Sequence, residues 1–149
     1  MHDHHMRALK DLKLKATPKR LAILDHLSRE PIYRSPEDVW HCLKGEFGRL
    51  GLPTVYRNLE ELAAGGVISK VLHPNRQLYY FYCRNREHHH HFICMACRRV
   101  EDLQTCAAEA LEREVGEKIG GMVLSHIVQV NGLCRDCAGE SRPGERSPE

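Results

Sequence analysis

The chain has 149 residues, of which 42% are hydrophobic and 28% are charged, a balance typical of one globular domain or of two small ones. No apolar run reaches the roughly 18 residues that a membrane-spanning helix needs, and no apolar leader follows Met1, so we expect a cytoplasmic protein without membrane association. Residues 1–83 hold 13 Lys and Arg against 9 Asp and Glu (+4), and residues 84–149 hold 9 against 11 (−2), which favours a polyanionic partner for the first half.

The first half contains several sequence signals for the start of a helix. After a short amphipathic stretch at residues 7–14, Thr17-Pro18 and then Ser35-Pro36 each place a hydroxyl side chain before a proline. A capping hydroxyl followed by a proline is typical of a helix N-terminus. Pro53-Thr54 opens a fourth helix, and Gly65-Gly66 ends it because glycine tolerates the left-handed C-terminal position. We therefore predict four helices.

The hydrophobic period then changes from that of a helix to that of a strand. Residues 67–72 and 77–82 are rich in β-branched and aromatic side chains and flank a turn at residues 73–76, which predicts a β-hairpin. Helices followed by a hairpin are typical of a winged helix-turn-helix, in which the helix before the hairpin enters the DNA major groove. The outward face of this helix would present groups able to contact bases and phosphates: Thr54, Tyr56, Arg57, Asn58 and Glu61.

The second half predicts a smaller mixed α/β unit. Its expected elements are strands at 89–94 and 98–103, a helix at 105–119, and a strand at 122–131 that is apolar enough to be buried on both faces. The fold class is therefore α+β. The predicted divisions are a winged-helix domain at 1–82, a linker at 83–87, a metal-binding domain at 88–138 and a disordered tail at 139–149.

Two cysteine pairs predict a structural zinc site. Cys94-Met-Ala-Cys97 and Cys134-Arg-Asp-Cys137 lie 36 residues apart, and two such knuckles supply the four thiolates of a tetrahedral Zn²⁺ centre. A disulfide framework is the alternative, and it requires an oxidising compartment. Cys42 and Cys106 are most simply small core residues.

Four consecutive histidines, His88 to His91, precede the first knuckle. In a strand, His88 and His90 would face one side and His89 and His91 the other, so one short run can serve two metal sites. Imidazole suits zinc, iron, nickel and copper alike, and a solvated polar strand is the alternative. The histidines at positions 2, 4 and 5 are expected to lie in a loose N-terminal tail.

Three motifs resemble the ferric uptake regulator (Fur) family. They are Gly51-Leu52-Pro53-Thr54-Val55-Tyr56-Arg57-Asn58-Leu59, the run His88-His89-His90-His91-Phe92-Ile93-Cys94-x-x-Cys97, and Gly132-Leu133-Cys134-x-x-Cys137. Their order and spacing extend the resemblance over residues 7–137. The resemblance implies a homodimeric repressor that binds a palindromic operator in double-stranded DNA, with an N-terminal winged helix and a C-terminal α/β dimerisation domain.

The resemblance also implies roles for individual residues. The four knuckle cysteines match the structural zinc site, and Lys15, Tyr56 and Arg57 match positions that contact DNA. A second site inside the dimerisation domain would be formed by His88, His90, Glu109 and His126. The regulatory site at the hinge would include His89 and His91, with Asp102 as a further carboxylate.

Two positions depart from the pattern of that family. Tyr33 stands where many members have a histidine of the hinge site, and Cys83 stands near the place of an acidic ligand. A thiolate is softer than a carboxylate, so it favours Zn²⁺ over Fe²⁺ or Mn²⁺. Our hypothesis for the regulatory site is therefore Cys83, His89, His91 and Asp102.

The sequence thus predicts a metal-responsive transcriptional repressor rather than an enzyme. Regulatory metal at the hinge would favour the DNA-competent arrangement of the dimer. Zinc sensing is favoured, and iron or peroxide sensing is the alternative. A zinc-ribbon adaptor that binds protein is the alternative of another class. A catalytic zinc site is disfavoured because neither H-E-x-x-H nor H-x-E with P-C-x-x-C occurs.

Overall fold

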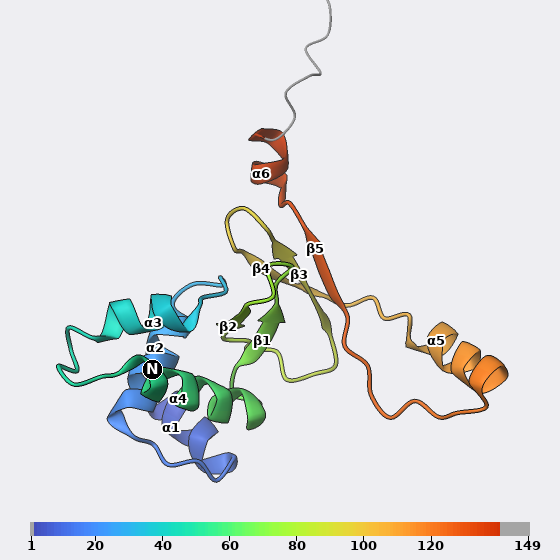
Figure 1. The fold of residues 1–149 in the computed structure, drawn as a ribbon. Coiled ribbons are helices and arrows are strands. Elements are labelled where there is room, and N and C mark those ends of the chain that lie inside the picture. The colour runs from blue at the N-terminus through green and yellow to red at the C-terminus, as the bar shows by residue number, and fades with distance from the viewer. Residues whose placement is uncertain (1, 141–149) are drawn as a thin grey trace, which may run out of the picture. The chain divides into compact units, whose positions relative to one another are not determined.

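The computed structural model describes residues 2–140, which form two compact units (Figure 1). The first unit ends at Arg84 and the second begins at Asn85. Within residues 2–140, none of the helices combines the length and the apolar character needed to cross a membrane. The architecture is α+β, as predicted, with most helices in the first unit and a three-stranded sheet in the second.

Two helices of the first unit begin where the predicted hydroxyl caps lie. Thr17 accepts a hydrogen bond from the Arg20 backbone N–H, and Ser35 forms a reciprocal capping box with Asp38. Such caps satisfy backbone donors that have no partner within the helix. The four helices are α1 (His2–Asp11), α2 (Pro18–Ser28), α3 (Pro36–Leu43) and α4 (Leu52–Ala64).

The first helix starts earlier than predicted. His2, His4 and His5 belong to α1, so the expectation of a loose tail is wrong for these residues. The reason is that the buried face of this helix extends towards the N-terminus. His5 lies three and four positions before Ala8 and Leu9, and all three residues are buried. The Nε2 atom of His5 lies 3.4 Å from Ser28 Oγ, whereas its Nδ1 atom is buried without a hydrogen-bond partner.

The predicted hairpin follows α4. Strands β1 (Ser69–Leu72) and β2 (Leu78–Phe81) pair antiparallel, and Tyr80 also bridges to Arg34. One hydrophobic core joins the helices to this hairpin, which is the arrangement of a winged helix. It consists of buried side chains from all four helices, their connections and the hairpin: Leu9, Ile23, Leu24, Leu27, Val39, Leu43, Leu50, Val55, Leu59, Leu62, Val67, Ile68 and Tyr80.

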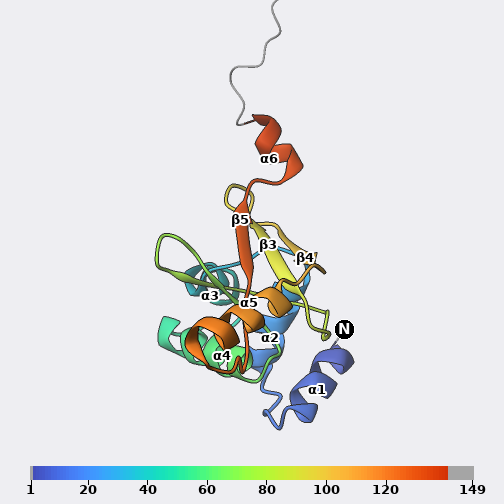
Figure 2. The same ribbon diagram turned by 90° about the vertical axis from the view of Figure 1, so that its right-hand side faces the viewer.

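The second unit is built on a sheet with the strand order β4-β3-β5 (Figure 2). Its central strand β3 (His90–Cys94) pairs antiparallel with β4 (Val100–Leu103) and parallel with β5 (Gln129–Gly132). Between β4 and β5 the chain forms α5 (Ala108–Glu114) and a π-helical turn η1 (Val115–Ile119), and α6 (Arg135–Glu140) follows β5. Figure 1 shows α5 standing apart from the strands of its own unit.

The strand predicted at 122–131 is largely wrong. Only residues 129–132 are extended in the sheet, and residues 120–128 have no regular structure. Two of the apolar side chains that suggested a strand buried on both faces are exposed instead, Leu124 by 88% and Ile127 by 94%. Sequence hydrophobicity predicted burial here, but the described part of the chain supplies no surface that covers this segment.

Candidate metal centres and nucleic-acid interface

The four knuckle cysteines come together in the second unit. Cys94 ends β3 and Cys97 lies in the turn that follows, whereas Cys134 lies between β5 and α6 and Cys137 lies in α6. The sulfur atoms of Cys97 and Cys134 are 3.7 Å apart. Zinc–sulfur bonds of about 2.3 Å give a tetrahedral edge of roughly 3.8 Å. The spacing of these thiols therefore fits a tetrahedral zinc ion.

The electrostatics of this cysteine centre favour a thiolate at Cys94. Burial opposes ionisation of its thiol, but the backbone N–H groups of Cys134, Cys97 and Ala96 lower the Cys94 pKa to about 6. By contrast, a hydrogen bond with Cys134 and partial loss of hydration raise the pKa of Cys137 to about 12. Cys94 thus ionises more readily than Cys137, and Cys137 must release its proton when metal binds.

The histidine run divides as the strand period predicts. His89 and His91 pack ring against ring with centroids 4.5 Å apart, and His88 and His90 do so at 4.8 Å. Alternate residues of an extended chain point to opposite sides. Two clusters of ligand atoms result, and they share no residue.

The first of these clusters, which we call the outer cluster, contains His89, His91 and Asp102. The Nε2 atoms of the two histidines are 2.8 Å apart and lie 3.6 and 3.5 Å from Asp102 Oδ1. Asp102 reaches them because β3 and β4 pair His91 with Asp102. The Nδ1 atom of His89 lies 2.6 Å from the Glu87 carbonyl oxygen. An N–H donated there leaves the lone pair of the ring on Nε2, the atom that faces His91 and Asp102, which is the usual second-sphere arrangement of metal-binding histidines.

Burial and the neighbouring His89 lower the pKa of His91, while Asp102 opposes that shift. A neutral imidazole is the form that binds metal. The proposed fourth ligand, Cys83, is half-buried and belongs to the first unit.

The second cluster, which we call the inner cluster, contains His88, His90, Cys106 and His126. His88 Nε2 lies 3.4 Å from Cys106 Sγ and 3.1 Å from His126 Nε2. Cys106 Sγ lies 3.1 Å from His126 Nε2. His90 is buried beneath the other two imidazoles, and loss of hydration, followed by the charges of His88 and His126, lowers its pKa.

The inner cluster corrects the expected role of Cys106. This cysteine is exposed and lies beside two imidazoles, so it is not a small core residue. The same expectation is wrong for Cys42, which is also exposed. Glu109, the fourth ligand expected by resemblance, lies exposed on the first turn of α5 and is not one of the four gathered residues. The sequence did not predict Cys106 as a member of this cluster, because residues 106 and 126 come together only in the folded chain. A signal was nevertheless present, since Cys106 lies three residues before Glu109, the ligand expected by resemblance.

In the first unit, α4 presents the residues expected to contact DNA. Tyr56 and Arg57 are exposed near its N-terminus, and Thr54 is half-exposed. The Tyr56 hydroxyl donates a hydrogen bond of 2.9 Å to Glu37, and that bond, together with partial desolvation, raises the Tyr56 pKa. Glu37 on α3 therefore orients this side chain on the exposed surface.

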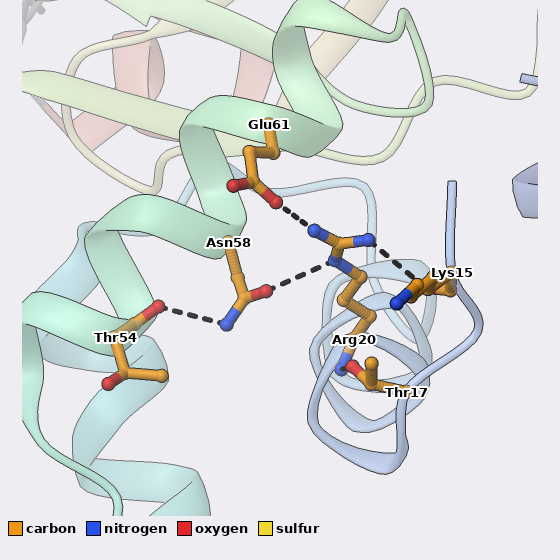
Figure 3. Close-up of polar contacts among 6 residues, drawn as sticks. All are labelled: Lys15, Thr17, Arg20, Thr54, Asn58 and Glu61. Atoms are coloured by element: carbon orange, nitrogen blue, oxygen red, sulfur yellow. Dashed lines mark hydrogen bonds and ion pairs between the residues drawn. The ribbon is translucent and has the colours of Figure 1, made fainter. Parts of the chain in front are cut away.

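Arg20 links α4 to the segment that carries Lys15 (Figure 3). Its guanidinium donates to Asn58 Oδ1 at 3.1 Å and to the Lys15 carbonyl at 3.1 Å, and it forms an ion pair with Glu61. Asn58 in turn donates to the Thr54 carbonyl at 2.9 Å. Asn58 is buried, so its predicted place on the outward face is wrong. Lys15 itself is exposed.

Residues 11–131 match the model of the ferric uptake regulator family. A ferric uptake regulation protein of Neisseria gonorrhoeae is 30% identical over 135 residues, which cover 90% of this chain and 93% of that protein. The crystal structure of the ferric uptake regulator of Vibrio cholerae has 27% identity and a TM-score of 0.62, with coverage of 87% of this chain and 99% of that one. A zinc uptake regulator complexed with zinc and DNA is similar in fold, with a TM-score of 0.76, 24% identity and 93% coverage of both chains.

Proposed function

This chain belongs to the ferric uptake regulator family of metal-responsive transcriptional regulators, and from that premise we propose that it is a cytoplasmic repressor whose regulatory metal binds at the hinge. The outer cluster is the observation that carries the proposal. His89, His91 and Asp102 gather three ligand atoms within 3.6 Å of one another, and Cys83 precedes them by six residues at the end of the first unit.

The regulatory step follows from where these ligands lie along the chain. Cys83 belongs to the first unit, and the other three ligands belong to the second. A metal bound to all four would restrict the relative motion of the two units and favour one arrangement. If that arrangement sets the two α4 helices of a dimer at the spacing of a palindromic operator, metal and DNA binding are coupled.

The four-cysteine centre has a different role in this proposal. Its ligands lie at the end of β3, in the turn after β3, between β5 and α6, and in α6, all within the second unit. Zn²⁺ there would join these elements and stabilise the fold of that unit. It would be retained in both the active and the inactive state of the repressor.

DNA binding would use α4 and the segment before α2. Tyr56 and Arg57 would contact base edges and phosphates in the major groove, with Thr54 nearby. Lys15 would reach the adjacent backbone or minor groove. Support comes from the exposure of Tyr56, Arg57 and Lys15 and from the basic balance of residues 1–83.

A homodimer is the third part of the proposal. The segment between η1 and β5 exposes large apolar side chains, including Met122 by 81% and Leu124 by 88%. Such a contiguous apolar surface usually marks a protein interface. A second copy of the chain would cover it and would bring two winged helices to one palindromic site.

Zinc is the favoured signal because the Cys83 thiolate is a soft ligand. Without Cys83, the outer cluster offers two imidazoles and one carboxylate, a set that suits Fe²⁺ or Mn²⁺. An iron- or peroxide-sensing repressor is therefore the second candidate.

Fluorescence anisotropy on the protein's own upstream promoter DNA tests the proposal. The zinc-loaded dimer would be titrated with buffered Zn²⁺ and, under anaerobic conditions, with Fe²⁺. Tight binding with trace free Zn²⁺ but not with Fe²⁺ supports the zinc sensor, and activation by Fe²⁺ supports the second candidate. Binding that is independent of added metal would contradict the hinge mechanism.

A further inference from the structure

The inner cluster has a donor set unlike that of the outer cluster. Three imidazoles and one thiol come from three separate segments of the second unit: the start of β3, the loop before α5 and the irregular segment before β5. The donor atoms all lie within 4.8 Å of one another.

The spacing of these atoms fits a small tetrahedral ion. Zinc–nitrogen bonds near 2.05 Å and a zinc–sulfur bond near 2.3 Å give tetrahedral edges of roughly 3.4 Å between two nitrogens and roughly 3.6 Å between nitrogen and sulfur. The observed nitrogen pair, His88 and His126, is 3.1 Å apart, and the two sulfur–nitrogen distances are 3.4 and 3.1 Å. For these three ligands, shifts of a few tenths of an ångström would match the edges of the tetrahedron, and the ligand atom of His90 lies within 4.8 Å of each of them.

His90 gives an independent indication that this cluster binds a cation. It is 3% exposed, and its Nε2 atom is buried without a hydrogen-bond partner. A buried donor or acceptor without a partner is unfavourable because it has lost its hydration and gained no hydrogen bond in exchange. Its ring lies against His88 and His126, so a cation held by those two histidines would give His90 a partner.

We propose that the inner cluster is a thiolate-containing metal site, with Cys106 as the fourth ligand in place of Glu109. The inference rests on the proposed function of a metal-responsive repressor and defines the metal class of a further site. Three imidazoles and a thiolate suit Zn²⁺ and disfavour Mn²⁺ and Fe²⁺. When metal binds, Cys106 releases its thiol proton to solvent and the sulfur becomes an anionic ligand.

Occupancy of this site would also close a loop. Cys106 and His126 bracket α5 and η1, which stand apart from the strands of their own unit. Metal bound to Cys106 and His126 would link the two ends of the segment that contains α5 and η1 to His88 and His90 at the start of β3. Hydrogen exchange of residues 107–125 should therefore slow when the site is filled.

Cobalt spectroscopy tests the identity of the fourth ligand. A C83S protein purified with zinc in its four-cysteine centre is titrated with Co²⁺, so Cys106 is the remaining thiolate near a histidine cluster. We expect visible bands of tetrahedral Co²⁺ together with a near-ultraviolet thiolate-to-cobalt band. The C83S/C106S protein should lose the thiolate band, and the matched C83S/E109Q protein should keep it.

Three outcomes would overturn the inference. Loss of tetrahedral bands in C83S/E109Q with retention in C83S/C106S would assign the site to Glu109. A thiolate band that survives in C83S/C106S would come from cobalt exchanged into the four-cysteine centre. Absence of tetrahedral cobalt in all three proteins would leave a hydrogen-bonded cluster only. Because none of these spectra depends on DNA, they are separable from failure of the proposed function, which the anisotropy measurement tests.

Discussion

At the scale of single residues, the ligand side chains of the proposed regulatory site determine its metal selectivity. In the outer cluster, two imidazoles and a carboxylate are common to several metals, and the thiolate of Cys83 would narrow that choice. The cysteine is therefore the residue at which metal selectivity can be tested most directly.

Replacing Cys83 by serine should abolish metal-dependent DNA binding and leave the dimer intact. The substitution removes the proposed ligand from the first unit, so metal would no longer link that unit to His89 and His91. Anisotropy with buffered Zn²⁺ measures the response, and sedimentation velocity measures the dimer. Cys42→Ser is the matched control, because Cys42 is an exposed cysteine of the same unit. An unchanged zinc response in C83S would remove Cys83 from the site.

Buried His5 should make the first unit sensitive to acid. Burial and the nearby His4 lower its pKa below 6.5, so the unfolded state binds more protons than the folded state. The stabilisation is fully present above pH 6.5 and is lost as the pH falls through 6.5 towards the lower folded value. His5→Gln should therefore lose less melting temperature than the wild type between pH 7.5 and 5.5, as measured by circular dichroism.

His41→Gln is the control for that comparison, since His41 is an exposed histidine of the same unit and is not among the groups that shift the pKa of His5. Equal acid sensitivity of the His5→Gln and wild-type proteins would show that His5 does not contribute.

At the scale of elements, α4 depends on α2 for its position. Arg20 satisfies the buried Asn58 amide oxygen and also holds the Lys15 carbonyl. A single side chain thus connects two segments that we expect to contact DNA.

Arg20→Gln should weaken binding to operator DNA by about tenfold or more. The variant loses the ion pair with Glu61 and leaves Asn58 Oδ1 short of a donor, a penalty of about 1–3 kcal/mol. Anisotropy over a range of salt concentrations separates the effects. A positioning role predicts a lower affinity with a nearly unchanged salt slope, whereas loss of a phosphate contact reduces the slope by about one.

Arg29→Gln is the matched control, because Arg29 is the C-cap residue of α2 and its exposed side chain forms a local ion pair with Asp25. A slope that falls in Arg20→Gln would indicate that the arginine contacts DNA itself.

Local signals predicted the elements of the first unit well. Thr17 and Ser35 cap α2 and α3 by contacts within three residues, so the sequence alone is sufficient to place them. Asn58 and Cys106 were misassigned because their partners, Arg20 and His126, are 38 and 20 residues away. The segment at 120–128 was predicted as a buried strand because its side chains are apolar. Hydrophobicity indicates that a segment favours burial, but it does not identify the surface that would cover it.

At the scale of the whole molecule, association should depend on the exposed apolar segment of the second unit. Met122 and Leu124 are 81% and 88% exposed, and burying each in a dimer would contribute about 1.5–3 kcal/mol. Changing both to glutamate should raise the dimer dissociation constant by on the order of 100-fold or more. Sedimentation equilibrium over a range of concentrations measures this change.

Leu72→Glu is the control for this double variant, because Leu72 is a similarly exposed leucine on the hairpin of the first unit. Unchanged association of the Met122→Glu/Leu124→Glu protein would place the dimer interface elsewhere.

The histidine run has a further consequence for how the two clusters are assigned. Four identical residues in succession cannot fix their own register, since a slip of β3 by one residue would still present two histidines on each face. The register must be set by what lies beyond the run, and β3 ends at Cys94 in the four-cysteine centre. Zinc bound to Cys94 would fix the position of β3 relative to its neighbouring strands and so set its register. The two histidine clusters would then depend on an ion with which they share no ligand.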